Sequence, residues 1–303
     1  MTAIRTAIVG GTGYTGGELL RILINHPGVE ITGVVARSSI GEPIHTVHQD
    51  LFGLTRLRFV DMVGPDVDIV FLALPHGEAA QFVATAKLSA RTRVIDLSAD
   101  NRYQTGYVYG LPELYAEQIR GATRVANPGC FATAIELALL PLATAGELGV
   151  VSITAVTGST GAGRALAPTS HFTWRANNLS VYKPFEHQHE AEINATLKHA
   201  GVRTGRLHMV PMRGDFTRGI LASVSLNTSL SSEAIAELYL QYYDDKPFTT
   251  VVPFNPELKH VVGTNRCFVH AERHGDQLHV VSVIDNLLKG ASGQAVENMN
   301  LMF

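Results

Sequence analysis

A glycine-rich loop separates an apolar run from an amphipathic run near the start of this chain, in the segment AIVGGTGYTGGELL. Three glycines of the loop follow one another at intervals of three residues. Glycine allows a tight turn and a close approach of backbone amides to a pyrophosphate at a helix N-terminus. A glycine triplet can also be a purely structural turn, but the strand–turn–helix setting favours dinucleotide binding. The predicted cofactor contacts are Gly10, Thr12, Gly13, Tyr14, Thr15 and Gly16.

The following residues alternate short apolar runs with helical patterns, which is typical of βαβ units and a parallel sheet. Strands are expected at 6–11, 30–37, 68–75 and 93–98, and helices at 16–27 and 79–90. The chain of 303 residues is long enough for two domains. We therefore predict an α/β protein whose residues 1–146 form a Rossmann-type dinucleotide-binding domain.

The second half of the chain has a different pattern of residues. Its strand-like segments are rich in β-branched residues, and its helical segments, 190–200 and 232–243, are separated by long connections. This pattern predicts a mostly antiparallel α+β domain over residues 147–285, which supplies substrate contacts and an oligomer interface. The tail at 286–303 reads as a loop and a helix that packs back on the first domain.

Charge and composition exclude several classes of protein. The chain has 24 basic and 27 acidic residues and a net charge of -3, which argues against a nucleic-acid-binding surface. No apolar run approaches the ~20 residues of a membrane helix, and no signal peptide is evident. Two cysteines do not make a disulfide framework, and a free thiol suits a reducing compartment. We expect a cytoplasmic protein that acts on a small molecule, without nucleic-acid or membrane partners.

The end of the second expected strand indicates which nicotinamide cofactor binds. NAD-binding proteins usually carry an Asp or Glu there, which binds the ribose 2′-hydroxyl. This chain has Arg37, Ser38 and Ser39 instead. A cation with two hydroxyls suits a 2′-phosphate, so the sequence favours NADP(H), with Arg37 and Ser38 as contacts. The alternative is that Arg37 is an ordinary surface residue.

One of the two cysteines, Cys130, follows Asn-Pro-Gly and opens an apolar helical run. Backbone amides and the helix dipole at such a position favour an anion, which lowers the pKa of a thiol. Cys130 could instead be a small buried hydrophobic residue. A nucleophilic thiol beside a nicotinamide cofactor suggests a specific chemistry, because a thioester accepts hydride and collapses to an aldehyde.

Six motifs now give a family resemblance, in order along nearly the whole chain: GGTGYTGGELLRIL, DLSADNR, NPGCFATA, GSTGAGR, HQHEAEI and KGASGQAVENMN. Together they resemble the N-acetyl-gamma-glutamyl-phosphate reductases of the aspartate-semialdehyde-dehydrogenase superfamily. The resemblance implies an enzyme of arginine biosynthesis that reduces an N-acylated glutamyl 5-phosphate to its semialdehyde with NADPH, releasing phosphate. It also implies a homo-oligomer, a dimer or a tetramer.

The resemblance assigns the reacting groups. Cys130 matches the family's nucleophile. His187 matches the first histidine of the family's His-Arg-His-x-x-Glu-Ile segment and is expected to transfer protons, because histidine titrates near neutral pH. His189 is expected to contact the substrate. Without the resemblance, the two histidines could be surface residues or metal ligands, but the reaction needs no metal and no cysteine cluster accompanies the pair, so we predict no metal.

Phosphate, substrate and nicotinamide contacts are expected from the remaining motifs. Arginine suits bidentate phosphate binding, although Arg102 could also pair with Asp96 or Asp100. The expected phosphate and substrate contacts are Arg102, Asn127, Ser159, Gly161 and Arg164. The KGASGQA loop matches the family's loop near the nicotinamide, where Asn286 or Gln294 is expected to bind the carboxamide.

Two segments, 171–185 and 211–219, depart from the family pattern and leave the acyl group open. The first contains Arg175 and Lys183, which could read the distal carboxylate of an N-succinyl substrate, although a solvated loop is the commoner use of such residues. Within the enzymes, aspartyl- and aminoadipyl-phosphate reductases remain alternatives. A non-catalytic NADP(H) sensor would share the glycine loop, but it would explain neither the cysteine turn nor the histidine pair.

Overall fold

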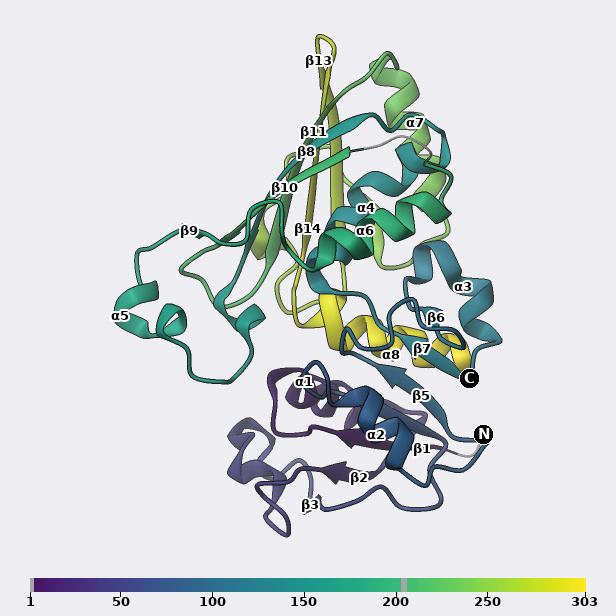
Figure 1. Ribbon diagram of the computed structural model, residues 1–303, viewed down its shortest axis with the longest axis vertical. Coiled ribbons are helices and arrows are strands. Elements are labelled where there is room, and N and C mark those ends of the chain that lie inside the picture. The colour runs from purple at the N-terminus through teal and green to yellow at the C-terminus, as the bar shows by residue number, and fades with distance from the viewer. Residues whose placement is uncertain (1–2, 203–205) are drawn as a thin grey trace. The chain divides into compact units, whose positions relative to one another are not determined.

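The computed structural model describes residues 3–202 and 206–303, and they form two compact units (Figure 1). The first unit combines Met1–Pro128 with Ala291–Phe303, and the second is Gly129–Gly290. The sequence predicted a division near residue 146. The observed division comes earlier because the helix that begins at Cys130 packs on the strands of the second unit.

The first unit is built on a seven-stranded sheet of order β3-β2-β1-β4-β5-β7-β6, in which every pair of neighbours is parallel. Its strands are β1 (Ile4–Val9), β2 (Val29–Val35), β3 (Phe59–Val60), β4 (Ile69–Leu72), β5 (Arg93–Asp96), β6 (Val108–Tyr109) and β7 (Arg124–Ala126). The strand order reverses between β1 and β4. In open parallel sheets, ligands bind at the carboxyl ends of the strands at such a point.

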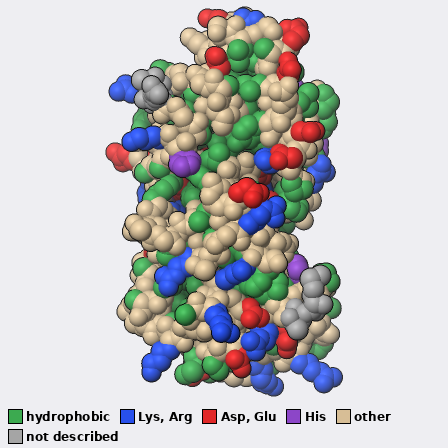
Figure 2. Space-filling view, turned by 90° about the vertical axis from the view of Figure 1, so that its right-hand side faces the viewer, with side chains coloured by type: hydrophobic (Ala, Val, Ile, Leu, Met, Phe, Trp, Pro, Cys, Tyr) green, Lys and Arg blue, Asp and Glu red, His purple; other side chains and the backbone are tan. Residues whose placement is uncertain are grey.

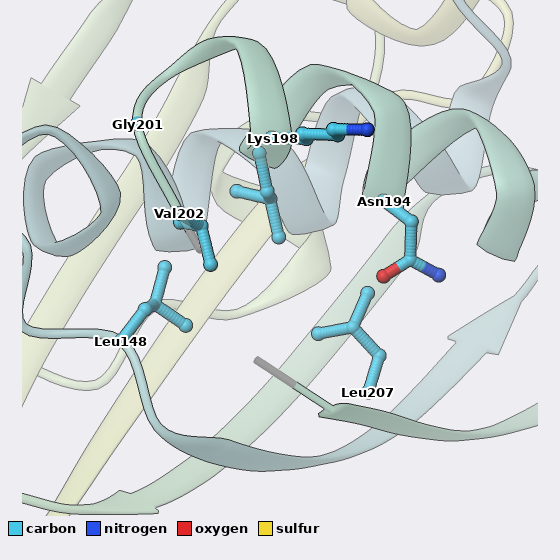
Figure 3. Close-up of a pocket in the computed structure, with 7 residues that line it drawn as sticks. Leu148, Asn194, Lys198, Gly201, Val202 and Leu207 are labelled. Carbon is cyan, nitrogen blue, oxygen red and sulfur yellow. The ribbon is translucent and has the colours of Figure 1, made fainter. Parts of the chain in front are cut away.

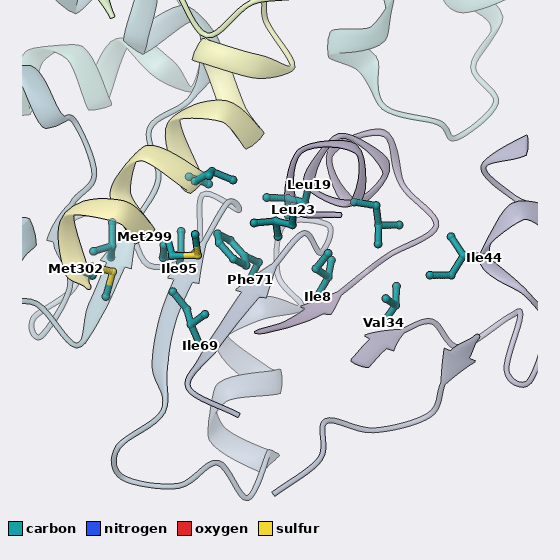
Figure 4. Packing of buried hydrophobic residues seen from close by; sticks show 14 of the residues in the cluster. Ile8, Leu19, Leu23, Val34, Ile44, Ile69, Phe71, Ile95, Met299 and Met302 are labelled. Atoms are coloured by element: carbon teal, nitrogen blue, oxygen red, sulfur yellow. The ribbon is translucent and has the colours of Figure 1, made fainter. Parts of the chain in front are cut away.

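The described residues of this unit form the helices α1 (Tyr14–Leu23), α2 (Ala79–Thr85), α3 (Pro112–Arg120) and α8 (Gly293–Met302). The short helical turns η1 (Ile44–Thr46) and η2 (Gln49–Leu51) also belong to it, whereas the π-helical η6 (Leu288–Ser292), which leads into α8, begins in the second unit. On one sheet face, Leu19 and Leu23 of α1 and Met299 and Met302 of α8 share a buried cluster with the strand residue Ile95 (Figure 4).

A separate cluster on the unit contains Val70 and Leu72 of β4 and Ala79 of α2. The strands are thus buried on both faces, which explains why their sequences are continuous apolar runs rather than alternating ones.

The second unit holds a mixed sheet of order β12-β13-β14-β11-β8-β10-β9. Its strands are β8 (Val150–Thr157), β9 (Ser180–Val181), β10 (Arg206–Arg213), β11 (Ile220–Asn227), β12 (Thr249–Val251), β13 (Cys267–His274) and β14 (Gln277–Ile284). The β8–β10 and β12–β13 pairs are parallel and the other pairs are antiparallel.

Helices α4 (Cys130–Thr144), α6 (His189–His199) and α7 (Ser232–Tyr243) lie together on one face of this sheet (Figure 1). The remaining helical segments are α5 (Phe172–Arg175), η3 (Ser159–Ala162), η4 (Pro168–Ser170) and η5 (Leu258–His260). Helix α4 is buried from its second residue to Ala143, and the Tyr239 hydroxyl of α7 donates to the Ala138 carbonyl at 2.7 Å. The first residue of this anchored helix, Cys130, is partly exposed.

Candidate active site

The glycine loop has the geometry that a pyrophosphate needs. Gly10 has a φ of +87°, and a Cβ there would lie 2.3 Å from the Ala73 carbonyl oxygen. A Cβ at Gly16 would lie 2.6 Å from the Gly10 carbonyl oxygen. Gly13 is the N-cap of α1 and makes no side-chain cap, and the first turn holds no acidic residue. An anion can therefore reach the positive end of this helix.

Arg37 follows β2 and is exposed, with 85% of its side chain accessible. Its Nη1 lies 3.3 Å from Oε2 of Glu78, at the start of α2. Asp100 holds this turn by accepting a hydrogen bond of 2.7 Å from the Gly77 amide. Ser38 is exposed as well. Arg37 is thus free to meet a ligand phosphate, in competition with one carboxylate.

Cys130 opens α4 directly after Gly129, the N-cap residue. Two backbone features hold this turn. The Gly129 amide donates to Oε1 of the buried Glu192 at 2.7 Å. Gly290 passes so close that a Cβ there would lie 2.9 Å from the Cys130 Cβ. The other cysteine, Cys267, is fully buried. The structure therefore presents only one of the two thiols at a helix start.

His187 and His189 lie together, with ring centroids 4.7 Å apart. The His189 backbone amide donates to Nδ1 of His187 at 3.2 Å. The neutral His187 ring therefore carries its proton on Nε2. Burial, followed by the charges of Lys183 and Arg213, lowers the pKa of His187 to about 4. His187 is a neutral hydrogen-bond donor at physiological pH.

His189 packs directly against the cysteine turn. A Cβ on Gly129 would lie 2.3 Å from the His189 Nε2 atom, so only glycine fits here. Both imidazoles make edge contacts with the Phe131 ring. His189 and Glu192 are three residues apart and share one face of α6, the spacing at which helical side chains are neighbours. That face thus meets the residue that precedes Cys130.

Tyr182 and Arg213 belong to the same cluster as His187, although neither was predicted as a site residue. The Tyr182 ring makes an edge contact with His187, at a centroid separation of 5.7 Å. Burial, reinforced by the charge of Cys130, raises the pKa of Tyr182 to about 12. The Arg213 guanidinium lies over the Tyr182 ring at 4.8 Å. Tyr182 and Arg213 are far apart in the sequence and come together only because β9 pairs with β10. Local sequence patterns could therefore not identify them.

The expected phosphate loop, with Ser159 and Gly161 in η3, is tied to the segment 216–219 in the same unit. The Ser159 amide donates to the Phe216 carbonyl at 2.9 Å. The expected contact Asn286 is buried here: its Oδ1 accepts from the Gly219 amide at 2.8 Å. Its Nδ2 donates to the Thr160 hydroxyl at 3.0 Å. The unusual segment 211–219 thus supports the phosphate loop.

Arg164 extends from the same loop and is exposed. The other three expected contacts belong to the first unit. Arg102 donates to the carbonyls of Asn127, at 3.0 Å, and Leu97. The Asn127 Nδ2 donates to the Ala291 carbonyl at 3.1 Å. Gln294 is fully buried in the first turn of α8.

The loop between β8 and α6 gives Arg175 a structural role. Its side chain is buried, and its guanidinium donates to the carbonyls of Thr169, Asn178 and Arg213 and to the Ser180 hydroxyl. These four contacts engage all three guanidinium nitrogens, so we no longer expect Arg175 to read a substrate carboxylate. Lys183 is exposed.

A cavity of 640 Å³ lies elsewhere in the second unit, at the end of α6 (Figure 3). Leu148, Leu197 and Leu207 line it, together with the polar Asn194 and Lys198. None of the predicted site residues lines it.

The surface charge in Figure 2 is mixed, and the described residues form no metal site. Figure 2 shows Lys and Arg side chains interspersed with Asp and Glu on the face that it draws. The described residues contain no group of three or more His, Cys, Asp or Glu side chains arranged to hold a metal ion. In the same part of the chain, no helix combines the length and the apolar character that crossing a membrane requires.

Comparisons with known proteins agree with this organisation. Residues 5–122 match the family model of the semialdehyde dehydrogenase NAD-binding domain, and residues 130–286 match that of the semialdehyde dehydrogenase dimerisation domain. The fold resembles aspartate semialdehyde dehydrogenase II of Vibrio cholerae, with a TM-score of 0.80 at 18% identity over 100% of this chain and 98% of that one. The enzyme of Candida albicans, solved with NADP, gives 0.73 at 14% identity over 99% and 98%.

Sequence relatives are closer. The N-acetyl-gamma-glutamyl-phosphate reductase of Christiangramia forsetii is 47% identical over an alignment of 305 residues, which covers 99% of this chain and 95% of that protein. The reductase of the same name from Bacteroides thetaiotaomicron is 48% identical over 306 residues, with the same coverage.

A parallel dinucleotide-binding sheet and a second unit with a cysteine at a helix start define the semialdehyde-dehydrogenase class. Within that class, the chain belongs to the N-acetyl-gamma-glutamyl-phosphate reductase family. The predicted family and the predicted fold class are both confirmed.

Proposed function

We propose that this protein reduces N-acetyl-glutamyl 5-phosphate to N-acetyl-glutamate 5-semialdehyde and phosphate, with NADPH as reductant, in arginine biosynthesis. The observation that carries the proposal is the setting of Cys130: a partly exposed thiol at the start of a 15-residue helix, with two imidazoles packed around its turn. The names of the relatives support the acetyl group and the chain length of the substrate.

The glycine loop fits the cofactor, because Gly10 and Gly16 leave no room for a side chain and α1 begins without a side-chain cap. We assign the pyrophosphate to the segment 10–16 and the 2′-phosphate to Arg37 and Ser38. Both ends of the Asn286 amide bind within the second unit, so Gln294 is the better candidate for the carboxamide. NADPH supplies the hydride.

Covalent catalysis begins at Cys130. Its thiolate attacks the acyl carbon, the bond from carbon to the phosphate oxygen breaks, and phosphate leaves with that electron pair. The thioester then accepts hydride at carbon. When the resulting thiohemiacetal collapses, the carbon–sulfur bond breaks and its electrons return to Sγ, which leaves the aldehyde. Two moderate barriers replace one difficult step.

We divide the proton chemistry between the two histidines. The family resemblance implied proton transfer by His187, but a group with a pKa of about 4 is a weak base for a thiol. His189 packs against the residue before Cys130, so we propose that it takes the thiol proton. His187 donates a hydrogen bond from Nε2 to the substrate oxygen on which charge develops.

Phosphate departure needs cations and amides around the leaving group. We retain Arg102, Asn127, Ser159, Gly161 and Arg164 as the proposed phosphate and substrate contacts. Arginine and backbone amides stabilise a developing phosphate dianion by charge-assisted hydrogen bonds.

We also propose that the protein is a homodimer formed through the uncovered face of the second sheet. Val150, Ser152 and Thr154 of β8 are exposed on that face, while their neighbours Val151 and Ile153 are buried beneath the helices. The matched dimerisation domain supports this assembly. Because the nucleophilic thiol must stay reduced, we place the enzyme in the cytoplasm.

The reverse reaction tests the proposed function. Purified protein is mixed with NADP⁺, phosphate and one semialdehyde from a panel: N-acetyl-glutamate, N-succinyl-glutamate, aspartate and aminoadipate semialdehydes. We expect NADPH to form only when phosphate is present, with the highest kcat/KM for the N-acetyl-glutamate compound. Preference for another member of the panel would overturn the substrate. NADP(H) binding without any phosphate-dependent oxidation would instead indicate a sensor.

A further inference from the structure

Arg213 ends strand β10, which lies between β8 and the edge strand β9. Its backbone is in register with Thr157 of β8 on one side and Ser180 of β9 on the other. Its carbonyl accepts a hydrogen bond of 2.7 Å from the buried Arg175. Its charged side chain therefore extends from a rigid part of the sheet.

The Arg213 guanidinium has an unused hydrogen-bond donor. It lies 4.8 Å above the Tyr182 ring, which is within the range of a cation–π contact. Its Nε atom is buried and has no hydrogen-bond partner among the described residues. An unsatisfied buried donor on a cation costs free energy that an anionic ligand would recover.

This cation belongs to the surroundings of the nucleophile. The charge of Cys130 contributes to the raised pKa of Tyr182, and the Tyr182 ring contacts His187. The charge of Arg213 also contributes to the lowered pKa of His187. All four residues are in the second unit. A ligand anion at Arg213 would thus be bound beside the reacting thiol.

The proposed substrate has two anionic groups, the acyl phosphate and the α-carboxylate. The motifs provide amides and arginines for the phosphate, but they leave the α-carboxylate without a partner. A carboxylate taken out of water requires a cation, and the planar guanidinium matches its two oxygens. A phosphate dianion, by contrast, is typically held by several amides and cations, which the glycine-rich loop around Gly161 offers.

We propose that Arg213 binds the α-carboxylate of the N-acyl-glutamyl substrate, with the Tyr182 hydroxyl as a second donor. This inference rests on the proposed function. It makes Arg213 the residue that restricts the enzyme to acyl groups derived from α-amino acids.

The test compares two substrates that differ only in this carboxylate. 4-Acetamidobutanal is N-acetyl-glutamate semialdehyde without its α-carboxylate. We expect Arg213→Met to lower kcat/KM for N-acetyl-glutamate semialdehyde by roughly ten- to a hundredfold, the usual value of a charged hydrogen bond. The value for 4-acetamidobutanal should change by less than about threefold, because that substrate never made the contact.

Arg206→Met is the matched control, since Arg206 is exposed at the other end of β10. It should leave both substrates unaffected. Arg213→Lys, which keeps the charge, should lose less activity than Arg213→Met and should retain the preference for the carboxylated substrate. If Arg213→Met does not fold, the lysine variant alone still measures the ratio between the two substrates.

Equal losses on both substrates would overturn the proposal, and so would a selective rise in the KM of phosphate, which would place Arg213 at the phosphate. Failure of the proposed function has a different signature. In that case the unmutated enzyme would show no phosphate-dependent oxidation of N-acetyl-glutamate semialdehyde.

Discussion

At the scale of single residues, the two cysteines show how position decides reactivity. Cys267 lies in β13 and is fully buried, with its sulfur 3.4 Å from the Ser282 hydroxyl. Cys130 stands at a helix N-terminus and is partly exposed. A helix start favours the thiolate, whereas an apolar interior favours the thiol.

We predict that Cys130→Ser lowers kcat by at least roughly a thousandfold, because a hydroxyl is a far weaker nucleophile at neutral pH. NADPH binding, followed by fluorescence, should remain unchanged. Iodoacetamide should label Cys130 before Cys267 in the native enzyme, as peptide mass spectrometry would show. Full activity of the serine variant would exclude covalent catalysis.

The lowered pKa of His187 makes a prediction about stability. Its value falls from 6.5 to about 4 on folding, so below pH 6.5 the unfolded chain binds the proton more readily than the native one. Stability is therefore lost as the pH falls from 6.5 toward 4. We expect His187→Asn to remove part of this loss, on the order of 1–2 kcal/mol, in urea unfolding of the free enzyme. Parallel pH profiles for the two proteins would contradict the assignment.

Arg37 carries the prediction about cofactor choice. Arg37→Ala should weaken NADPH binding by roughly ten- to a hundredfold and leave NADH binding nearly unchanged, because only the 2′-phosphate contact is lost. Glu78→Gln is the companion variant. It removes the carboxylate that competes for Arg37, so it should strengthen NADPH binding. Titration calorimetry with both cofactors decides the matter, and equal losses for the two would rule out Arg37 as the discriminator.

At the scale of elements, α8 is an example of a helix that packs against elements far from it in the sequence. Its sequence lies at the end of the chain, yet it contacts α1, α3 and β5 of the first unit. Met299 is fully buried in that cluster. The sequence predicted a loop and a helix for this tail, with the helix packed back on the first domain.

Met299→Ala should lower the free energy of unfolding by about 2–4 kcal/mol, because it leaves a cavity among buried side chains. Asn300→Ala, at the exposed next position of the same helix, is the control and should cost much less. Chemical denaturation followed by circular dichroism measures both. Similar values for the two variants would mean that α8 adds little to the core.

Local patterns predicted the long elements and failed for those that depend on partners. A single sequence is enough to recognise the apolar runs at β1 and β4 and the helical spacing of α6 and α7. Two-residue strands such as β3 and β9 are too short to show a periodicity. Strand β10 contains Pro211, a residue that argues against a strand in a sequence pattern. Helix α4 was predicted, but its apolar sequence could not show on which sheet it packs, so the division was expected at residue 146 rather than 128.

The candidate site was predictable to the same extent. Cys130 and the two histidines lie in motifs that are continuous in sequence, so they were visible. Tyr182 and Arg213 are separated by 31 positions and meet because β9 pairs with β10. The structural role of Arg175 was not predictable for the same reason, since its partners are three carbonyls and the Ser180 hydroxyl, which no sequence pattern marks.

At the scale of the whole molecule, the chain combines a unit that fits a dinucleotide with a unit that carries the proposed nucleophile. The family models match these two parts separately, at 5–122 and 130–286. The reaction that this combination implies passes through an acyl group bound covalently to Cys130.

A single-turnover experiment without phosphate detects this covalent intermediate. The enzyme is mixed with N-acetyl-glutamate semialdehyde and NADP⁺ in the absence of phosphate, and NADPH formation and intact protein mass are followed together. We predict a burst of one NADPH per active site and an N-acetyl-glutamyl adduct on Cys130, which disappears when phosphate is added and turnover resumes. Continuous NADPH formation without phosphate, or a burst without an adduct on Cys130, would contradict the account.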